Sequence, residues 1–505
     1  MIGRWWNVGR RAWSWAVPLA AAGALAAADA PFLSSPVLSD EVFTLEAARL
    51  DWASLWRHLQ ADVHPPLYYA AVKLWLEVLG HSLIALRGFS LLMALAAVAV
   101  ASRVLPQPEP GRGWAAWFLA ADGIFLVMAF YGRMYSMLAL LCLLAWLASD
   151  QRLRRGARGW SALAAVTAAA GFCTHHFFGF FLAALAVWLA LVHGRAFLRL
   201  WPEWSAGVAA WAVLWGKTAF EQFTQRPQHL AWVQPMSLAR WAEVAAAHLA
   251  FAAAALPAAL LALGFLPRRR SARWPAESRA AAVAALAALA LPGLISVWKP
   301  VWNPRFTVIA SPFLAAALAP LGPVSAGVWP VAATAAGGGW LWWGGSQTKC
   351  TSQAAARQLA AAATASDTVV FCRMTRKPVE YYWIGAAPQR RSFPAEIDAH
   401  PGYEGRQTEA SLREEARQLA RSAAGRVFVV ADLSRPAPRI LIEALEDAGF
   451  QRQPPLLECA SAGKHYFHLL AVFDPPLKQT ESLSAAPPAP GSPPRDPVAR
   501  AYERR

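Results

Sequence analysis

The sequence predicts a polytopic α-helical membrane protein with a small α/β domain at its C-terminal end. Of its 505 residues, 57% are hydrophobic and only 15% are charged. Apolar stretches of about 20 residues, the length that crosses a bilayer, recur along most of the chain. In a soluble protein the net charge of +16 would suggest nucleic-acid binding. In a membrane protein arginine gathers on one side of the bilayer, so we expect no nucleic-acid partner.

We expect about 11 transmembrane helices. Their apolar segments lie at residues 13–32, 83–105, 113–131, 134–148, 160–174, 177–193, 203–219, 242–266, 279–298, 306–322 and 324–344. Arginine-rich connections, such as "QRLRRGAR" and "PRRRSAR", fall on one side, which marks the cytoplasm. The N-terminus then lies in the cytoplasm, and an odd number of spans puts the C-terminal domain outside. An alanine-, arginine- and tryptophan-rich composition suits a bacterium with a GC-rich genome, so we expect the inner membrane and a periplasmic C-terminal domain.

The chain divides into three parts by composition. Residues 1–344 form the transmembrane domain, with a large first periplasmic loop at 33–82. Residues 345–475 contain amphipathic stretches and short β-like runs such as "DTVVFC" and "GRVFVVAD", which indicate an α/β domain. Residues 476–505 are rich in proline, alanine and serine, which is typical of a disordered tail. At the N-terminus, "RWWNVGRR" before an alanine-rich stretch leaves a cleaved signal peptide as an alternative to a first span.

The five cysteines carry little functional information. Cys142 and Cys173 fall in expected spans, where a small apolar side chain is ordinary. Cys350, Cys372 and Cys459 fall outside, where an oxidising compartment permits at most one disulfide among three thiols. No metal-ligand spacing is present.

Polar side chains at the ends of the expected spans gather on the outer side. They are Asp40, Glu41, Asp62, His64, Arg87, Arg133, Tyr135, His175, His176, Trp232 and Arg305. Each has a plainer interpretation: Asp62 suits a helix N-cap before two prolines, Trp232 an interface anchor and Arg305 a snorkelling side chain. Together, acids, imidazoles and guanidinium groups at one membrane depth indicate a site for a polar, anionic ligand.

The order of these residues resembles a known family. An acidic pair in "SDEVFTLEAARL", then "DVHPPLYYAAVKLW" and "LRGFS", is similar to bacterial glycosyltransferase family 39 of the GT-C superfamily, which is related to protein O-mannosyltransferases and the lipid A aminoarabinose transferase. Later stretches, "GRMYSMLALL", "CTHHFFGFF", "AWVQPMSL" and "PVWNPRFTV", resemble weaker family motifs. The resemblance covers about residues 30–320. The chain departs from the family where "FYG" precedes Arg133, and where His176 and Phe306 replace tyrosine.

The resemblance implies a membrane glycosyltransferase that moves a hexosyl or pentosyl group, with inversion, from a polyprenyl-phosphate donor to an acceptor hydroxyl on the periplasmic face. It implies Asp40 as the base and Glu41 as a second catalytic residue that contacts the substrate and orients the acceptor or sugar hydroxyls. The implied substrate-binding residues are Asp62, His64, Arg87, Arg133, Tyr135, His175, Trp232 and Arg305. A divalent metal ion on Asp40 and Glu41 stays open, as does the acceptor, whether lipid, protein or glycan.

Three alternatives remain at this point. A ligase or oligosaccharyltransferase-type enzyme of the same superfamily would move a larger glycan. A secondary transporter would place its site near the bilayer midplane, between broken helices. A structural membrane protein would be inert toward every lipid-linked sugar.

Overall fold

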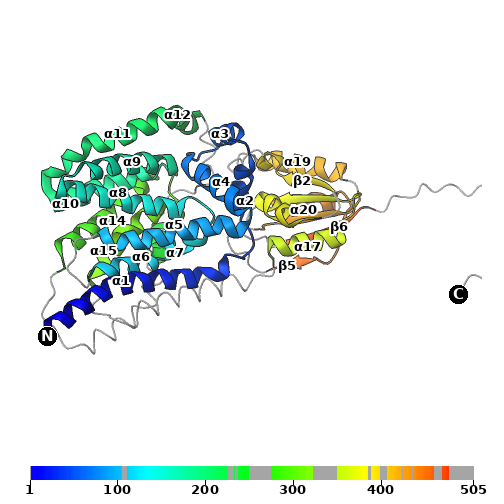
Figure 1. Ribbon diagram of the computed structural model, residues 1–505. Coiled ribbons are helices and arrows are strands. Elements are labelled where there is room, and N and C mark those ends of the chain that lie inside the picture. The colour runs from blue at the N-terminus through cyan, green and yellow to red at the C-terminus, as the bar shows by residue number, and fades with distance from the viewer. Residues whose placement is uncertain are drawn as a thin grey trace, which may run out of the picture.

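The computed structural model describes residues 2–104, 111–225, 233, 237–248, 274–321, 350–384, 388–398, 407–423, 425–433, 436–459 and 469–476. Within them, a bundle of apolar helices bears a layer of short helices at one end, and an α/β unit adjoins that layer (Figure 1). The candidate site residues are contributed by the short helices and by the neighbouring bundle turns.

The bundle consists mainly of apolar helices. They are α1 (Ile2–Asp29), α5 (Leu83–Val104), α6 (Gly111–Ala120), α7 (Gly123–Phe130), α8 (Tyr135–Arg155), α9 (Arg158–Thr174), α10 (Phe178–His193), α11 (Trp201–Trp211), α12 (Lys217–Gln225), α14 (Ala276–Ile295) and α15 (Ser311–Leu318). Among the described residues, four helical stretches are long and apolar enough to cross a membrane, or five if a bent pair counts as one. Of the segment expected at 242–266, the part beyond residue 248 lies outside the described residues. The whole segment expected at 324–344 also lies outside them.

The segment expected as one span at 113–131 is broken. The helix axis bends by 71° between its two halves, α6 and α7. Asp122 stands at the break and accepts a hydrogen bond from the amide of Phe125 at 2.8 Å, so its carboxylate caps the first turn of α7. An ionisable residue inside an apolar segment therefore ends one helix and starts another, and α7 leads into the turn at 131–134.

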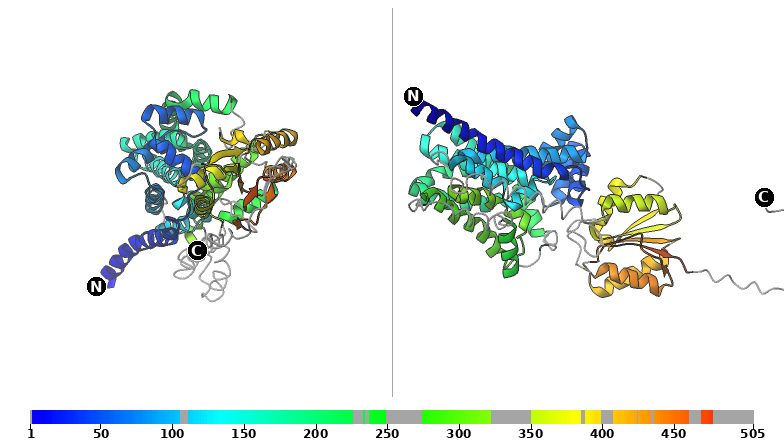
Figure 2. Two further views of the ribbon diagram at one scale, coloured as in Figure 1. Left: turned by 90° about the vertical axis from the view of Figure 1, so that its right-hand side faces the viewer. Right: turned by 90° about the horizontal axis from the view of Figure 1, so that it is seen from below.

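The C-terminal unit is a six-stranded sheet between helices (Figure 2). Its strands are β1 (Thr368–Cys372), β2 (Gln389–Phe393), β3 (Val427–Ala431), β4 (Gln451–Arg452), β5 (Leu457–Glu458) and β6 (Leu469–Asp474), in the order β2-β1-β3-β6-β4 with β5 paired to β6. β1 is parallel to β2 and β3, whereas β6 runs antiparallel to β3. One face packs against α17 (Ser352–Ala362) and α18 (Arg376–Tyr382), the other against α19 (Glu409–Ser422) and α20 (Ala437–Asp447). The tail expected to be disordered lies outside the described residues from 477 onward.

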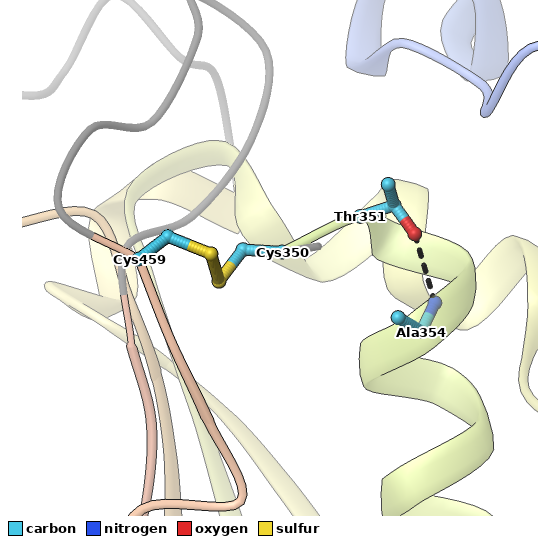
Figure 3. The surroundings of a disulfide bond; sticks show 4 residues. All are labelled: Cys350, Thr351, Ala354 and Cys459. Atoms are coloured by element: carbon cyan, nitrogen blue, oxygen red, sulfur yellow. Dashed lines mark hydrogen bonds between the residues drawn. A yellow bond between two sulfur atoms is a disulfide. The ribbon is translucent and has the colours of Figure 1, made fainter. Parts of the chain in front are cut away.

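A disulfide joins the start of this unit to its last strands. Cys350 and Cys459 are bonded across a sequence separation of 109 residues (Figure 3). The third outer cysteine, Cys372, is buried in β1. The sequence left open which of the three outer cysteines form a disulfide, and the structure pairs Cys350 with Cys459.

Removing this disulfide should destabilise the C-terminal unit. The Cys350→Ser/Cys459→Ser variant should lose about 2–4 kcal/mol of stability, because the unfolded segment is no longer closed into a long loop. Limited proteolysis of the full-length protein should then cleave the unit faster. Reductant should have the same effect on the wild type and none on the double variant. Equal cleavage rates for all samples would contradict this expectation.

Three short helices lie between the bundle and the sheet unit. They are α2 (Ser39–Arg49), α3 (Trp52–Ala61) and α4 (Leu67–Leu79), and Figure 1 shows them as one layer. α18 of the sheet unit packs along α2. The amide of Val37 donates to the Tyr382 hydroxyl at 2.7 Å, and Lys377 pairs with Glu46 at 2.6 Å. The sheet unit therefore supports the helix that carries the acidic pair.

Tyr382→Phe should loosen the start of α2. The variant loses one acceptor for a partly buried amide, worth about 1 kcal/mol. Hydrogen exchange of residues 35–39 should accelerate severalfold, while the neighbouring Tyr381→Phe change should leave it unaltered. Unchanged exchange in both variants would show that α18 does not support α2.

Candidate functional site

The acidic pair begins helix α2, and its two carboxylates point in different directions. Negative side chains are stabilised in the first turn of a helix, where Asp40 and Glu41 lie. Successive residues of a helix are rotated by about 100°. Asp40 consequently keeps 26% of its side chain exposed, whereas Glu41 is fully buried.

Glu41 and Arg87 form a buried ion pair, which differs from the substrate contacts expected of both. Arg87 Nε donates to Glu41 Oε1 at 2.8 Å and Nη2 donates to Oε2 at 2.7 Å, with neither side chain exposed. The same guanidinium also donates to the backbone carbonyls of Phe32, Leu33, Ser35 and Pro36. Because this pair is already bonded and shielded, it fixes the chain before α2 and does not face a ligand.

The turn after α7 docks onto this pair. Gly132 donates its amide to Glu41 Oε1 at 3.0 Å. A Cβ at this position would lie 2.7 Å from Leu86 Cγ and 3.1 Å from Glu41 Oε1, so only glycine lets the backbone come so close. The docked turn presents Tyr131 and Arg133 to the exposed side of α2.

Asp40 is the centre of the partly exposed cluster. Its Oδ2 accepts from Arg305 Nη1 at 2.5 Å and from the Tyr131 hydroxyl at 2.6 Å. Arg133 donates to the backbone carbonyl of Asp40 at 3.1 Å. Burial alone would raise the pKa of Asp40, but the charges of Arg305 and Arg133 and the Tyr131 hydrogen bond outweigh it and hold that pKa well below its usual range. Asp40 is therefore ionised at every physiological pH.

A second chain of polar side chains leads from Arg133 to Asp62. Arg133 Nη2 lies 3.1 Å from His64 Nε2, and His64 Nδ1 lies 2.5 Å from Asp62 Oδ2. A guanidinium can only donate, so His64 Nε2 accepts and its proton sits on Nδ1, facing Asp62. The histidine and aspartate of "DVHPP" are thus joined to Arg133 by hydrogen bonds.

Aromatic rings form one wall beside Arg305. Tyr135 lies 6.1 Å from Tyr131, and His175 lies 5.0 Å from Phe306, measured between ring centroids. His175 is buried and its Nδ1 accepts the amide of Phe177 at 3.1 Å. Burial lowers the pKa of His175 well below its usual value, because an imidazolium would lose its hydration there. A neutral His175 lines this wall.

His176 stands apart from the cluster. His176 packs against Phe223 and Trp211, and burial lowers its pKa to about 4. Trp232 lies outside the described residues.

Asp40 and Glu41, the two carboxylates left open as metal ligands, are bonded to different groups. Asp40 and Glu41 have separate partners, and both oxygens of Glu41 are bonded to Arg87. In the part of the chain that the structure describes, no three His, Cys, Asp or Glu side chains gather in a metal-binding arrangement. A cation beside Asp40 would also have to compete with Arg305.

Tyr131 is the site residue that sequence reasoning missed. Its hydroxyl donates to Asp40 and lies 3.0 Å from Arg305 Nη1. It belongs to the same "YGRMY" turn as Arg133 and Tyr135, but a tyrosine next to an apolar segment has no distinctive signal. Only the contact between this turn and α2 reveals it.

Apolar helices of spanning length indicate a multi-helix membrane protein, and the Asp40 carboxylate, bonded to Arg305 and Tyr131, is the centre of a polar cluster at one end of the bundle. Solved structures share its fold, and two of them are of one protein. ArnT from Cupriavidus metallidurans bound to undecaprenyl phosphate superposes with a TM-score of 0.54 and 13% identity, over 93% of this chain and 98% of that one. The same protein in the apo state gives a TM-score of 0.54 and 13% identity, over 94% and 98%. No family model and no curated protein sequence matches this chain.

Proposed function

We propose that this protein is a membrane glycosyltransferase. It transfers one sugar from a polyprenyl-phosphate donor to an acceptor hydroxyl on the periplasmic face, with inversion at the anomeric carbon. The observation that carries the proposal is the partly exposed Asp40–Arg305 pair, 2.5 Å apart, on a fold shared with ArnT, whose crystal structure holds undecaprenyl phosphate.

The donor phosphate binds the guanidinium groups of Arg305 and Arg133 in this proposal. Arg305 keeps 25% of its side chain exposed, so a phosphate can approach it. Guanidinium offers two parallel donors to phosphate oxygens and stabilises the negative charge that develops as the sugar departs. Asp62 and His64 act by orienting Arg133.

Asp40 acts as the base toward the acceptor hydroxyl. While Arg305 and Tyr131 bond to its carboxylate, Asp40 is a weak base, because both contacts favour the ionised form. A phosphate that draws Arg305 onto itself removes the nearest positive charge from Asp40 and raises its basicity. Donor binding thereby prepares the carboxylate to accept the hydroxyl proton as the hydroxyl attacks the anomeric carbon.

Donor consumption by the purified protein in lipid nanodiscs tests this function. The substrates are polyprenyl phosphates that carry one hexose, one pentose or a longer glycan, and the product measured is free polyprenyl phosphate. We expect turnover of a single-sugar donor. Turnover of the long glycan alone would indicate a ligase-type enzyme, and a folded protein that consumes none of them would contradict the proposal.

A further inference from the structure

A second polar cluster lies inside the bundle, away from Asp40. Asp122 Oδ2 is 2.8 Å from His248 Nδ1, His248 Nε2 is 2.9 Å from Thr307 Oγ1, and Ser311 donates to Asp122 Oδ1 at 3.0 Å. All four side chains are at least nine-tenths buried. They come from the α6–α7 break, from the helical residues 238–248, and from the segment Pro304–Ala310 (η5) with the start of α15.

The hydrogen atoms of this cluster can be assigned by counting. Thr307 Oγ1 lies 2.6 Å from the Pro304 carbonyl, which has no proton to give, so the threonine hydroxyl donates there. His248 Nε2 must then carry a proton and donate to Thr307. The contact between His248 Nδ1 and Asp122 Oδ2 needs another proton. Filling all of these hydrogen bonds therefore takes one proton more than a neutral histidine and an ionised aspartate hold together.

The cluster joins three helical segments through the turn that carries Arg305. Thr307 is two residues beyond Arg305 in η5, and Asn303 caps the start of that turn by accepting the Arg305 amide at 3.1 Å. A hydrogen-bonded group inside a low-dielectric bundle is costly to disrupt, so it holds its attached turn in one place. Arg305 lies in η5, and from there its guanidinium reaches the Asp40 carboxylate.

We propose that Asp122 and His248 are positioning residues that fix the Arg305 turn through hydrogen bonds. The proposal rests on the proposed function in that Arg305 serves as the phosphate ligand. Neither residue contacts the reacting groups.

Two substitutions of Asp122 separate this role from the alternatives. In Asp122→Asn, the amide oxygen still accepts from the Phe125 amide and the Ser311 hydroxyl. The amide nitrogen donates to a neutral His248. Every hydrogen bond is therefore kept without the additional proton. Asp122→Leu has a similar volume and keeps none of them. Asp51, which caps the exposed start of α3, provides the matched control as Asp51→Leu.

The experiment measures undecaprenyl phosphate binding to the full-length variants in nanodiscs and hydrogen exchange of residues 302–311. We expect Asp122→Leu to weaken binding by roughly tenfold or more and to accelerate exchange in that segment. Asp122→Asn and Asp51→Leu should match the wild type in both measurements. In an Arg305→Gln background, Asp122→Leu should weaken binding no further, because its effect passes through Arg305.

Two results would overturn the proposal. If Asp122→Asn behaved like Asp122→Leu, the charge or the proton would matter and not the hydrogen bonds. If the effects of Asp122→Leu and Arg305→Gln were additive, the cluster would act elsewhere. A wild type that does not bind the lipid would refute the proposed function, whereas the exchange of residues 302–311 would still decide whether the cluster holds the turn.

Discussion

Asp40→Asn is expected to abolish sugar transfer while leaving the fold and donor binding intact. An amide cannot take the proton of the acceptor hydroxyl, and loss of a general base costs about 10²–10⁴-fold in rate. The asparagine also competes less for Arg305, because the 2.5 Å contact is no longer an ion pair. Binding of undecaprenyl phosphate should consequently be as tight as in the wild type or tighter.

The combination of lost turnover and retained binding is the informative result. It is measured with the single-sugar donor assay and a binding titration on the same nanodisc preparation. Asp62→Asn provides a comparison, since Asp62 contacts His64 and not the reacting groups, so its loss of rate should be smaller. Full turnover by Asp40→Asn would exclude Asp40 as the base.

Glu41→Ala is expected to have the largest effect on stability. It leaves the fully buried Arg87 guanidinium without its carboxylate, and breaking one side of such a pair costs about 3–5 kcal/mol. It also removes the acceptor for the amides of Leu38 and Gly132. The thermal unfolding midpoint of the detergent-solubilised protein should fall by many degrees, and little folded protein should be recovered.

Glu46→Ala on the same helix is the matched control, because it removes a carboxylate that is exposed and not buried. Glu46 pairs with Lys377 at the surface, each side chain 47% exposed, and Glu46→Ala should cost less than about 1 kcal/mol. Replacing both members of the buried pair, as Glu41→Leu/Arg87→Met, should recover part of the lost stability. A stable but inactive Glu41→Ala protein would instead support the original expectation that Glu41 contacts the substrate.

The sequence predicted several of the polar residues that the structure brings together, because such residues stand out beside apolar segments. Asp40, His64, Arg133 and Arg305 come from distant positions and meet within one network. Because the bilayer excludes charged groups, those at the ends of spans turn toward the protein and pair with one another. The mostly helical bundle and the small C-terminal sheet follow from hydropathy and from the later β-like runs.

What the sequence did not predict depends on contacts between elements. Adjacent acids look alike in "SDE", and only the docking of Arg87 and Gly132 separates a buried Glu41 from a partly exposed Asp40. The bend at Asp122 has a local signal, a carboxylate inside an apolar run, but its partner His248 is 126 residues away. Spacing along the chain carries no information on such a pair.

The most direct test of the account is a structure of the protein with a bound polyprenyl-phosphate sugar. We expect the phosphate within hydrogen-bonding distance of Arg305 and Arg133, Arg305 moved off the Asp40 carboxylate, and the freed Asp40 oxygen facing the anomeric carbon from the side opposite the phosphate. A phosphate bound away from both arginines, or one bound while Arg305 still pairs with Asp40, would contradict it.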